Sequence, residues 1–120
     1  MKDERAILYV QTSNDPERQF SPLVLAQTAK AMGLEPTMFY MGMSLTILRP
    51  GEPEKIQVGS FSTFAEMLAR TMEMEIPVLV CEPSKQLLGL DKVELIDGVK
   101  IVGAATLNDL ALDAGATMWF

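Results

Sequence analysis

The sequence predicts an α/β fold in which one sheet of about five mainly parallel strands lies between two layers of helices. Short apolar runs, typical of strands covered on both faces, alternate along the chain with stretches whose apolar residues repeat at helical spacing. Such alternation favours parallel pairing and right-handed crossovers, and hence a three-layer α/β/α sandwich. The length of 120 residues suits a single domain, 1–120, with a core of its own.

The first strand and the first helix are predicted from the N-terminal third of the chain. Residues 6–10 are almost wholly apolar, and polar turn residues follow them. Ser21 and Pro22 then form an N-cap and first-turn pair, which predicts a helix over 22–32. Gly33 is placed to serve as the left-handed C-terminal cap of that helix.

The middle of the chain predicts a second strand and the clearest helix. The strand covers 35–41, and a short helical turn over 44–48 follows it. The helix is predicted over 60–75, because Thr63 and Glu66 have the spacing of a capping box. In that motif the threonine oxygen and the glutamate carboxylate satisfy backbone N–H groups that the first turn leaves free.

The C-terminal part predicts three further strands separated by two helices. The helix after the third strand begins near Pro83, and the last helix begins near Thr106 and ends at Gly115. The strands are predicted over 76–81, 99–102 and 116–120.

The residue composition excludes several classes of chemistry. Histidine is absent, which excludes a Ser-His-Asp triad, a Cys-His pair and a His-ligated zinc site. The single cysteine, Cys81, excludes disulfides within the chain, CxxC redox pairs and sites made of several thiolates. No metal and no cofactor is predicted, since neither GxGxxG nor GxxxxGK[ST] occurs.

Charge and hydropathy exclude nucleic acid and membrane as expected partners. The chain carries 10 Lys plus Arg against 16 Asp plus Glu, a formal net charge of -6, whereas a nucleic-acid binder needs a basic surface. No apolar run approaches the ~18 residues that a membrane span needs. The first residues pass into an apolar run without a signal-peptide layout, so the expected location is the cytoplasm.

The stretch 76–84 contains the main candidate for chemistry. Its apolar run ends in Cys81, and Pro83 follows as a helix start, so Cys81 is expected in a strand-to-helix turn. Open α/β sheets bind ligands at that edge. Backbone N–H groups that open the helix favour a thiolate, whereas the carboxylate of Glu82 disfavours it. The alternative is a buried cysteine that packs as a small hydrophobic residue.

Several residues in order and spacing carry a resemblance to a known family. They are Cys81 at the end of the third strand, Ser84, Leu88-Gly89, the run Val-Lys-Ile-Val-Gly-Ala-Ala-Thr-Leu-Asn-Asp-Leu over 99–110, and Ala26, Met32 and Gly33 before the second strand. Through them the chain resembles the DsrE/DsrF-like family of small sulfur-relay proteins over nearly its full length.

The resemblance implies a flavodoxin-like fold with five mainly parallel strands, assembled as a homo-oligomer or hetero-oligomer. It also implies that Cys81 accepts sulfane sulfur as a persulfide and passes it to a partner thiol, as a sulfurtransferase-type carrier does. Sulfur-donor and sulfur-acceptor proteins are then the expected partners. Ser84 matches the family spacing, without an assigned role.

Other polar residues are candidates for the same pocket. Thr12, Ser13 and Asn14 follow the first strand and are expected at the carboxyl edge of the sheet, near Cys81 and Ser84. Their alternative role is to form the turn through hydrogen bonds to the local backbone.

The C-terminal aromatic pair suggests an oligomer. Trp119 and Phe120 would be costly to leave in water, so they either cover the domain's own core or lie at a subunit interface. The resemblance to the family favours the interface, and a homo-oligomer is the expectation that it implies. Two functions remain open. One is a persulfide carrier that uses Cys81, and the other is a non-enzymatic oligomeric binding or assembly module in which Cys81 is inert.

Overall fold

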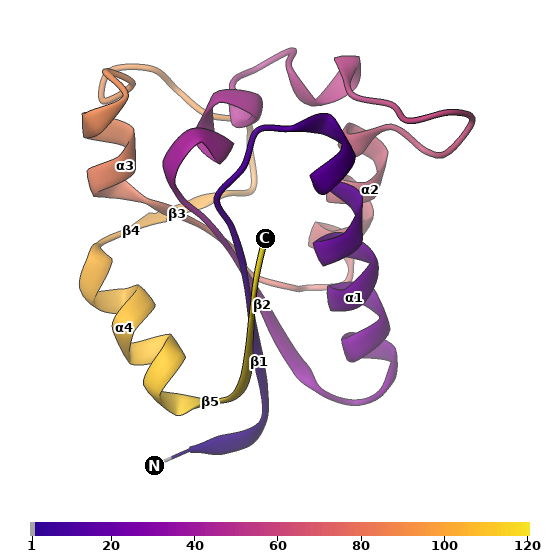
Figure 1. Ribbon diagram of the computed structural model, residues 1–120, viewed down its shortest axis with the longest axis vertical. Coiled ribbons are helices and arrows are strands. Elements are labelled where there is room, and N and C mark those ends of the chain that lie inside the picture. The colour runs from indigo at the N-terminus through magenta and orange to yellow at the C-terminus, as the bar shows by residue number, and fades with distance from the viewer. Residues whose placement is uncertain (1) are drawn as a thin grey trace.

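The computed structural model describes residues 2–120 and confirms the α/β class and the three-layer α/β/α sandwich (Figure 1). Its strands are β1 (Asp3–Gln11), β2 (Glu35–Tyr40), β3 (Val78–Cys81), β4 (Lys100–Val102) and β5 (Ala114–Trp119). Its α-helices are α1 (Phe20–Ala31), α2 (Phe64–Glu73), α3 (Glu82–Leu87) and α4 (Ala104–Asp113). Short 3-10 helices are η1 (Pro16–Arg18), η2 (Gly42–Leu48) and η3 (Pro53–Lys55).

The five strands pair in the order β4-β3-β2-β1-β5, and every pair is parallel. In the register of the sheet, Val10 of β1 lies beside Phe39 of β2 on one side and Trp119 of β5 on the other. The edges of the sheet are therefore β4 and β5. Because all strands run the same way, the loops after β1, β2 and β3 meet at one rim, the carboxyl edge.

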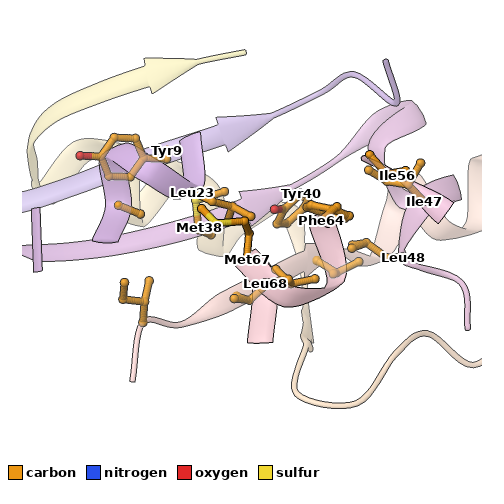
Figure 2. Close-up of a cluster of buried hydrophobic side chains, with 14 of the residues drawn as sticks. Tyr9, Leu23, Met38, Tyr40, Ile47, Leu48, Ile56, Phe64, Met67 and Leu68 are labelled. Atoms are coloured by element: carbon orange, nitrogen blue, oxygen red, sulfur yellow. The ribbon is translucent and has the colours of Figure 1, made fainter. Parts of the chain in front are cut away.

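The helices α1 and α2 cover one face of the sheet, and α4 covers the opposite face (Figure 1). The α1/α2 side holds the larger cluster of buried side chains (Figure 2), among them Tyr40, Phe64 and Leu68. Tyr40 is completely buried, which raises the pKa of its hydroxyl, and within residues 2–120 that hydroxyl finds no hydrogen-bond partner. This face supplies most of the apolar burial that stabilises the domain.

The α4 side holds a smaller cluster, called here the α4-side cluster. Its buried members are Leu8, Val10, Phe39, Leu79, Cys81 and Ala114. Partly buried side chains of Met41, Val102, Leu107, Leu110 and Ala111 pack against it. No residue of α4 is fully buried, so this helix covers its face less completely than α1 and α2 cover theirs.

The predicted start of the first helix is wrong, and its predicted end is confirmed. α1 begins at Phe20 with Gln19 as N-cap, so Pro22 lies inside the first turn, where a missing N–H costs no hydrogen bond. At the other end Gly33 adopts φ +81, and the N–H of Leu34 donates to the carbonyl of Ala29 at 3.0 Å. This is the Schellman pattern expected of a glycine cap.

The capping box of α2 is confirmed, although the helix begins at Phe64 rather than at residue 60. The N–H of Glu66 donates to Thr63 Oγ1 at 3.1 Å, and the N–H of Thr63 donates to Glu66 Oε1 at 2.9 Å. The hydrogen bonds that the Thr63 N–H and the Thr63 hydroxyl donate to the Glu66 carboxylate, with a smaller contribution from Arg70, lower the pKa of Glu66.

The predicted limits of the last helix are both wrong. α4 has Gly103 as N-cap instead of Thr106, and it passes at Asp113 directly into β5. Gly115 belongs to β5 and ends no helix. A Cβ at Gly115 would lie 2.8 Å from the Glu4 backbone, so glycine is required there for the close approach of β1 and β5.

Candidate functional site

Cys81 lies at the carboxyl edge of the sheet, as the last residue of β3 and the N-cap residue of α3. Side chains alternate along β3, so Val78 and Val80 point into the α1/α2 cluster and Leu79 and Cys81 into the α4-side cluster. The predicted strand-to-helix turn is therefore present. Cys81 is only 4% exposed, however, and its thiol lies within an apolar layer.

Two segments, β4 and α4, cover the α4-side cluster at the carboxyl edge, where Cys81 lies. Val102 is the register partner of Cys81 on β4, and α4 begins two residues later. α4 then runs back from the carboxyl edge toward the amino ends of the strands (Figure 1). Several residues of α4 pack against the α4-side cluster. Among them, Leu107 lies in the N-terminal half of the helix and is therefore nearest the carboxyl edge.

Ser84 lies in the same turn as Cys81 and joins it to the loop after β2. Its side chain is buried, and its Oγ accepts a hydrogen bond from the N–H of Gly42 at 2.9 Å. Gly42 adopts φ +61, and a Cβ there would lie 3.5 Å from the carbonyl oxygen of Thr12. Gly42 is consequently the contact between the loop after β1 and the first turn of α3.

The three polar residues after β1 form hydrogen bonds with their own surroundings. Thr12 donates from its N–H and its Oγ1 to the carbonyl of Phe120, at 2.8 and 2.7 Å. The Oγ of Ser13 accepts from the N–H of Asp15 at 3.0 Å, and Asn14 Nδ2 donates to Thr46 Oγ1 at 3.1 Å. All three stay at the carboxyl edge, but their hydrogen bonds hold loops in place rather than reach the turn at Cys81.

Buried amide and hydroxyl side chains that the sequence did not single out organise this edge. Gln11 donates to the carbonyl of Arg18 at 2.8 Å, and Gln19 donates to the carbonyls of Ser13 and Asp15, both at 2.8 Å. Ser44 donates to the carbonyl of Gln11 at 2.9 Å, which joins the loops after β1 and β2. Gln11 follows an apolar run and Gln19 follows two charged residues, so no local pattern marked these side chains as buried.

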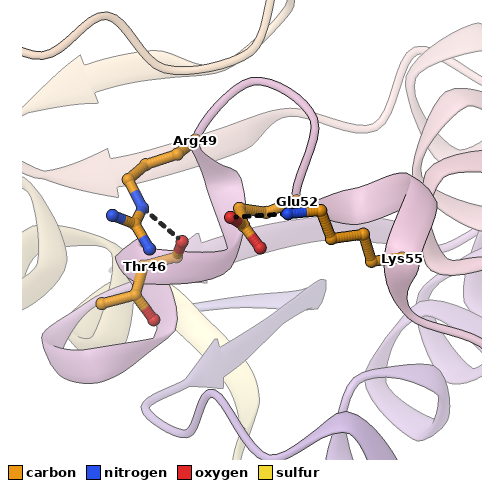
Figure 3. A network of polar contacts seen from close by, with 4 residues as sticks. All are labelled: Thr46, Arg49, Glu52 and Lys55. Carbon is orange, nitrogen blue, oxygen red and sulfur yellow. Dashed lines mark hydrogen bonds and ion pairs between the residues drawn. The ribbon is translucent and has the colours of Figure 1, made fainter.

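The segment after η2 is held by exposed polar contacts (Figure 3). Arg49 Nε donates to the carbonyl of Thr46 at 2.9 Å, and Lys55 Nζ lies 3.4 Å from Glu52 Oε1. An exposed ion pair of this kind adds about 0–1 kcal/mol to stability. These exposed contacts therefore add little to the stability of the protein.

Within residues 2–120, Cys81 lines neither of the following two cavities. A small one of about 140 Å³ lies beside α3 and is lined by Glu82, Lys85, Gln86, Asp91 and Ile101. A larger open groove of about 680 Å³ lies along α1 and the 58–61 loop. Among residues 2–120 no group of three or more metal-binding side chains occurs, and no helix is long and apolar enough to cross a membrane.

Comparisons with known proteins agree with this architecture. A protein of Methanocaldococcus jannaschii called uncharacterized protein MJ0760 is 25% identical over 118 residues, which cover 98% of this chain but 43% of that protein. The chain thus spans less than half the length of that relative. The sulfur carrier protein DsrE2 of Allochromatium vinosum is 21% identical over 149 residues, covering 91% of this chain and 94% of that protein.

A solved structure shares the fold. The crystal structure of the YchN protein from E. coli matches with a TM-score of 0.78 and 22% identity, covering 98% of this chain and all of that one. The model of the DsrE/DsrF-like family matches residues 5–120, which is nearly the whole chain and leaves out only the start of β1 among the strands and helices. The chain therefore belongs to the DsrE/DsrF-like family.

Proposed function

We propose that the protein is a sulfur carrier in which Cys81 accepts sulfane sulfur as a persulfide and passes it to a partner thiol. The observation that carries this proposal is the position of Cys81 at the junction of β3 and α3, on the edge where open α/β folds place their chemistry. Membership of a sulfur-relay family and a relative named as a sulfur carrier support it.

The proposed reaction needs one cysteine per chain and no oxidant. The Cys81 thiolate attacks the outer sulfur of a donor persulfide, R–S–SH; a new S–S bond forms, the donor's S–S bond breaks, and R–S⁻ leaves. In the second step an acceptor thiolate attacks the outer sulfur of the Cys81 persulfide, takes it, and leaves the Cys81 thiolate. Both steps follow the rules of thiol–disulfide exchange, in which a thiolate is the nucleophile. A reducing compartment such as the cytoplasm, the proposed location, keeps the thiol free.

Access to the thiol is the structural requirement of this proposal. Cys81 is 4% exposed, so the donor's outer sulfur reaches it only when part of the cover moves. The N-terminal half of α4, with Leu107, is the element that we expect to move, because no residue of α4 is fully buried. Opening a half-buried helix costs less than opening the core on the α1/α2 side.

A second candidate function is the non-enzymatic oligomeric binding or assembly module with an inert Cys81. The burial of the thiol in an apolar cluster, and its position outside the two cavities beside α3 and α1, favour this alternative. A buried cysteine in such surroundings behaves as a small hydrophobic residue.

Mass spectrometry of the folded protein after incubation with glutathione persulfide separates the two functions. Three proteins are compared: the wild type, Cys81→Ser, and a double variant that combines Cys81→Ser with Ser60→Cys. Ser60 is exposed, so the double variant presents a thiol at the protein surface. A carrier is expected to gain one sulfur atom at Cys81 while the protein stays folded, and to return it to an added acceptor thiol.

The opposite result identifies the inert module. If the folded wild type gains no sulfur and resists alkylation, while the exposed control and the urea-unfolded wild type both react, Cys81 is a packing residue and the carrier proposal fails. Cys81→Ser, which has no thiol, sets the background in every arm.

A further inference from the structure

The open groove of about 680 Å³ along α1, called here the α1 groove, gathers exposed apolar side chains. Phe20, Val24 and Leu25 of α1 form one wall, and Val58 and Phe61 of the loop before α2 form the other. All of them except Phe20 are exposed. The volume lies within the ~300–1,000 Å³ of small-molecule sites. Exposed apolar side chains that gather in one hollow indicate a binding site rather than ordinary surface.

The loop that forms the second wall is held by its own hydrogen bonds. Gln57 Nε2 donates to the carbonyl of Phe61 at 2.7 Å, and the N–H of Phe61 donates to the carbonyl of Val58 at 3.3 Å. The loop between η3 and α2 projects from the side of the molecule that α1 and α2 cover (Figure 1). The wall is therefore formed before any ligand arrives, which lowers the cost of binding.

Two aromatic rings of the α1 groove stand at right angles to each other. The centroids of Phe20 and Phe61 are 5.6 Å apart, and the ring planes make an angle of 83°. The walls of such a corner are parts of ring faces, and ring faces attract a cation that lies within about 6 Å of the centroid. Aromatic side chains arranged in this way are what proteins use to bind quaternary and methylated ammonium groups.

The charge of the α1 groove also favours a cation. Glu17 is the one charged residue of its lining, and it precedes Phe20 and Ser21 at the N-terminal end of α1. Within residues 2–120 no basic side chain pairs with its carboxylate. The N-terminus of α1 carries about half a positive charge, which is less than the full negative charge of the carboxylate. The net charge of -6 adds to the attraction for cations.

The length of the apolar wall suits a small molecule better than a helix of another protein. From Phe20 to Leu25 the wall covers five residue steps, or about 7.5 Å of α1. A docked helix inserts side chains at i, i+3 or i+4, and i+7, which span roughly 10.5 Å. The wall is therefore too short for the usual set of anchors.

We propose that the α1 groove binds a small organic ammonium ion. Its apolar body lies between α1 and the loop before α2, and its cationic group lies between the corner of Phe20 and Phe61 and the carboxylate of Glu17. Phe20 packs against the cluster on the α1/α2 side, whereas Cys81 belongs to the α4-side cluster. The groove is thus on the other face of the sheet, and the proposal does not depend on sulfur transfer at Cys81.

Three probes with the same eight-carbon chain test the charge preference: octyltrimethylammonium, 1-octanol and octanoate. Each is titrated into the wild-type protein, and binding is followed by the backbone amide signals in NMR spectra. Saturable shifts are expected in residues 17–25 and 58–61. Octyltrimethylammonium is expected to bind about tenfold more tightly than octanol, because the neutral head gains nothing from the rings or the carboxylate. Octanoate is expected to bind most weakly.

Four variants assign the binding to the α1 groove. Glu17→Gln removes the charge and is expected to weaken octyltrimethylammonium several-fold while octanol is unchanged. Glu73→Gln is its control, since Glu73 is an exposed residue at the end of α2 and is not part of the lining. Phe61→Ala removes one wall and is expected to weaken both probes. Leu87→Ala, on α3 and 84% exposed, is expected to change neither.

Four outcomes would overturn the proposal. The absence of saturable shifts in the α1 groove would show that it holds no small ligand. Equal affinities for the three probes would identify an unselective apolar surface, as a protein partner needs. Equal losses in Glu17→Gln and Glu73→Gln would indicate a general effect of net charge. A change in molecular mass by light scattering in Phe61→Ala would assign the groove to contacts between copies of the chain.

Discussion

The two faces of the sheet differ in how firmly their helices are attached. On one face α2 buries Phe64, Met67, Leu68 and Thr71 and begins with a complete capping box. On the other face α4 buries no residue fully, and its N-cap, Gly103, makes no side-chain cap hydrogen bond. The single thiol of the protein lies under the second, less firmly held helix. The stability of the protein is therefore expected to depend mainly on the α1/α2 face, and access to Cys81 on the α4 face. A substitution on one face is then expected to change one property without the other.

The largest effect is expected from the firmly packed face. Phe64 is completely buried, so Phe64→Ala is expected to lower the free energy of unfolding by about 3–5 kcal/mol, measured by urea denaturation. Phe61→Ala is the control, because that ring is 49% exposed and contacts Phe20 edge-to-face at a centroid distance of 5.6 Å; its loss is expected to stay near 1 kcal/mol. Equal losses for the two rings would contradict the assignment of stability to this face.

On the α4 face, a substitution is expected to change access more than stability. Leu107 is only partly buried, so Leu107→Ala is expected to cost less than the ~2–5 kcal/mol of a fully buried leucine, yet to raise the alkylation rate of Cys81 in the folded protein several-fold. The measurement is thiol alkylation well below the unfolding midpoint. Leu110→Ala provides the comparison, since Leu110 lies farther from the carboxyl edge. Identical rates in the two variants would exclude a local cover at Leu107.

The capping box of α2 is expected to contribute a smaller amount. Thr63→Ala removes the hydroxyl that accepts from the N–H of Glu66, and a loss of about 1 kcal/mol in the free energy of unfolding is expected. Thr63→Ser keeps the hydroxyl and should retain most of the stability. If serine and alanine destabilise α2 equally, the threonine methyl group rather than the cap is what matters.

The same box makes part of the stability depend on pH. The pKa of Glu66 is lowered in the folded protein, first by its hydrogen bond from the Thr63 backbone, so its contribution is fully present above the ordinary pKa of 4.5 and is lost as pH falls below it. The urea midpoints of wild type and Glu66→Gln are therefore expected to converge in acid. A difference that stays constant from neutral pH to acid would argue against this linkage.

The smallest change is a gain on the less firmly held face. Gly103 has φ -80, and no atom lies within 4 Å of a Cβ built there, so Gly103→Ser fits without strain. A cap hydroxyl and a less flexible unfolded chain are expected to add about 0.5–1 kcal/mol to the free energy of unfolding. If α4 is the moving cover, the alkylation of Cys81 should slow in the same variant.

The sequence predicted the architecture because the central strands can be recognised from their local sequence. Buried parallel strands are apolar on both faces, so runs such as Val78–Cys81 stand out without any knowledge of their neighbours. Helix limits were harder, because Ser21 and Thr106 are good caps whose use depends on where the chain turns. At α1 and α4 the turn occurs earlier, and Gln19 and Gly103 become the caps.

The candidate site was predicted in position but not in exposure. The end of an apolar run followed by Pro83 places Cys81 in a strand-to-helix turn, and that turn is present. Its burial depends on α4, which begins more than twenty residues later in the sequence and folds back over β3. The sequence around residue 81 contains no pattern that indicates its contact with α4. The roles of Gly42 and Ser44 in joining the loops were not predicted, for the same reason.

The junction between α4 and β5 makes this part of the chain intolerant of insertions and deletions. Asp113 ends the helix and Ala114 begins the strand, so no loop residue separates them. One residue added or removed here would turn every β5 side chain to the opposite face of the sheet. Trp119 would then point to the α1 side and Met118 to the α4 side, and the glycine that passes the Glu4 backbone would move out of place. Length, rather than side-chain identity, is the property that the chain must keep at this position.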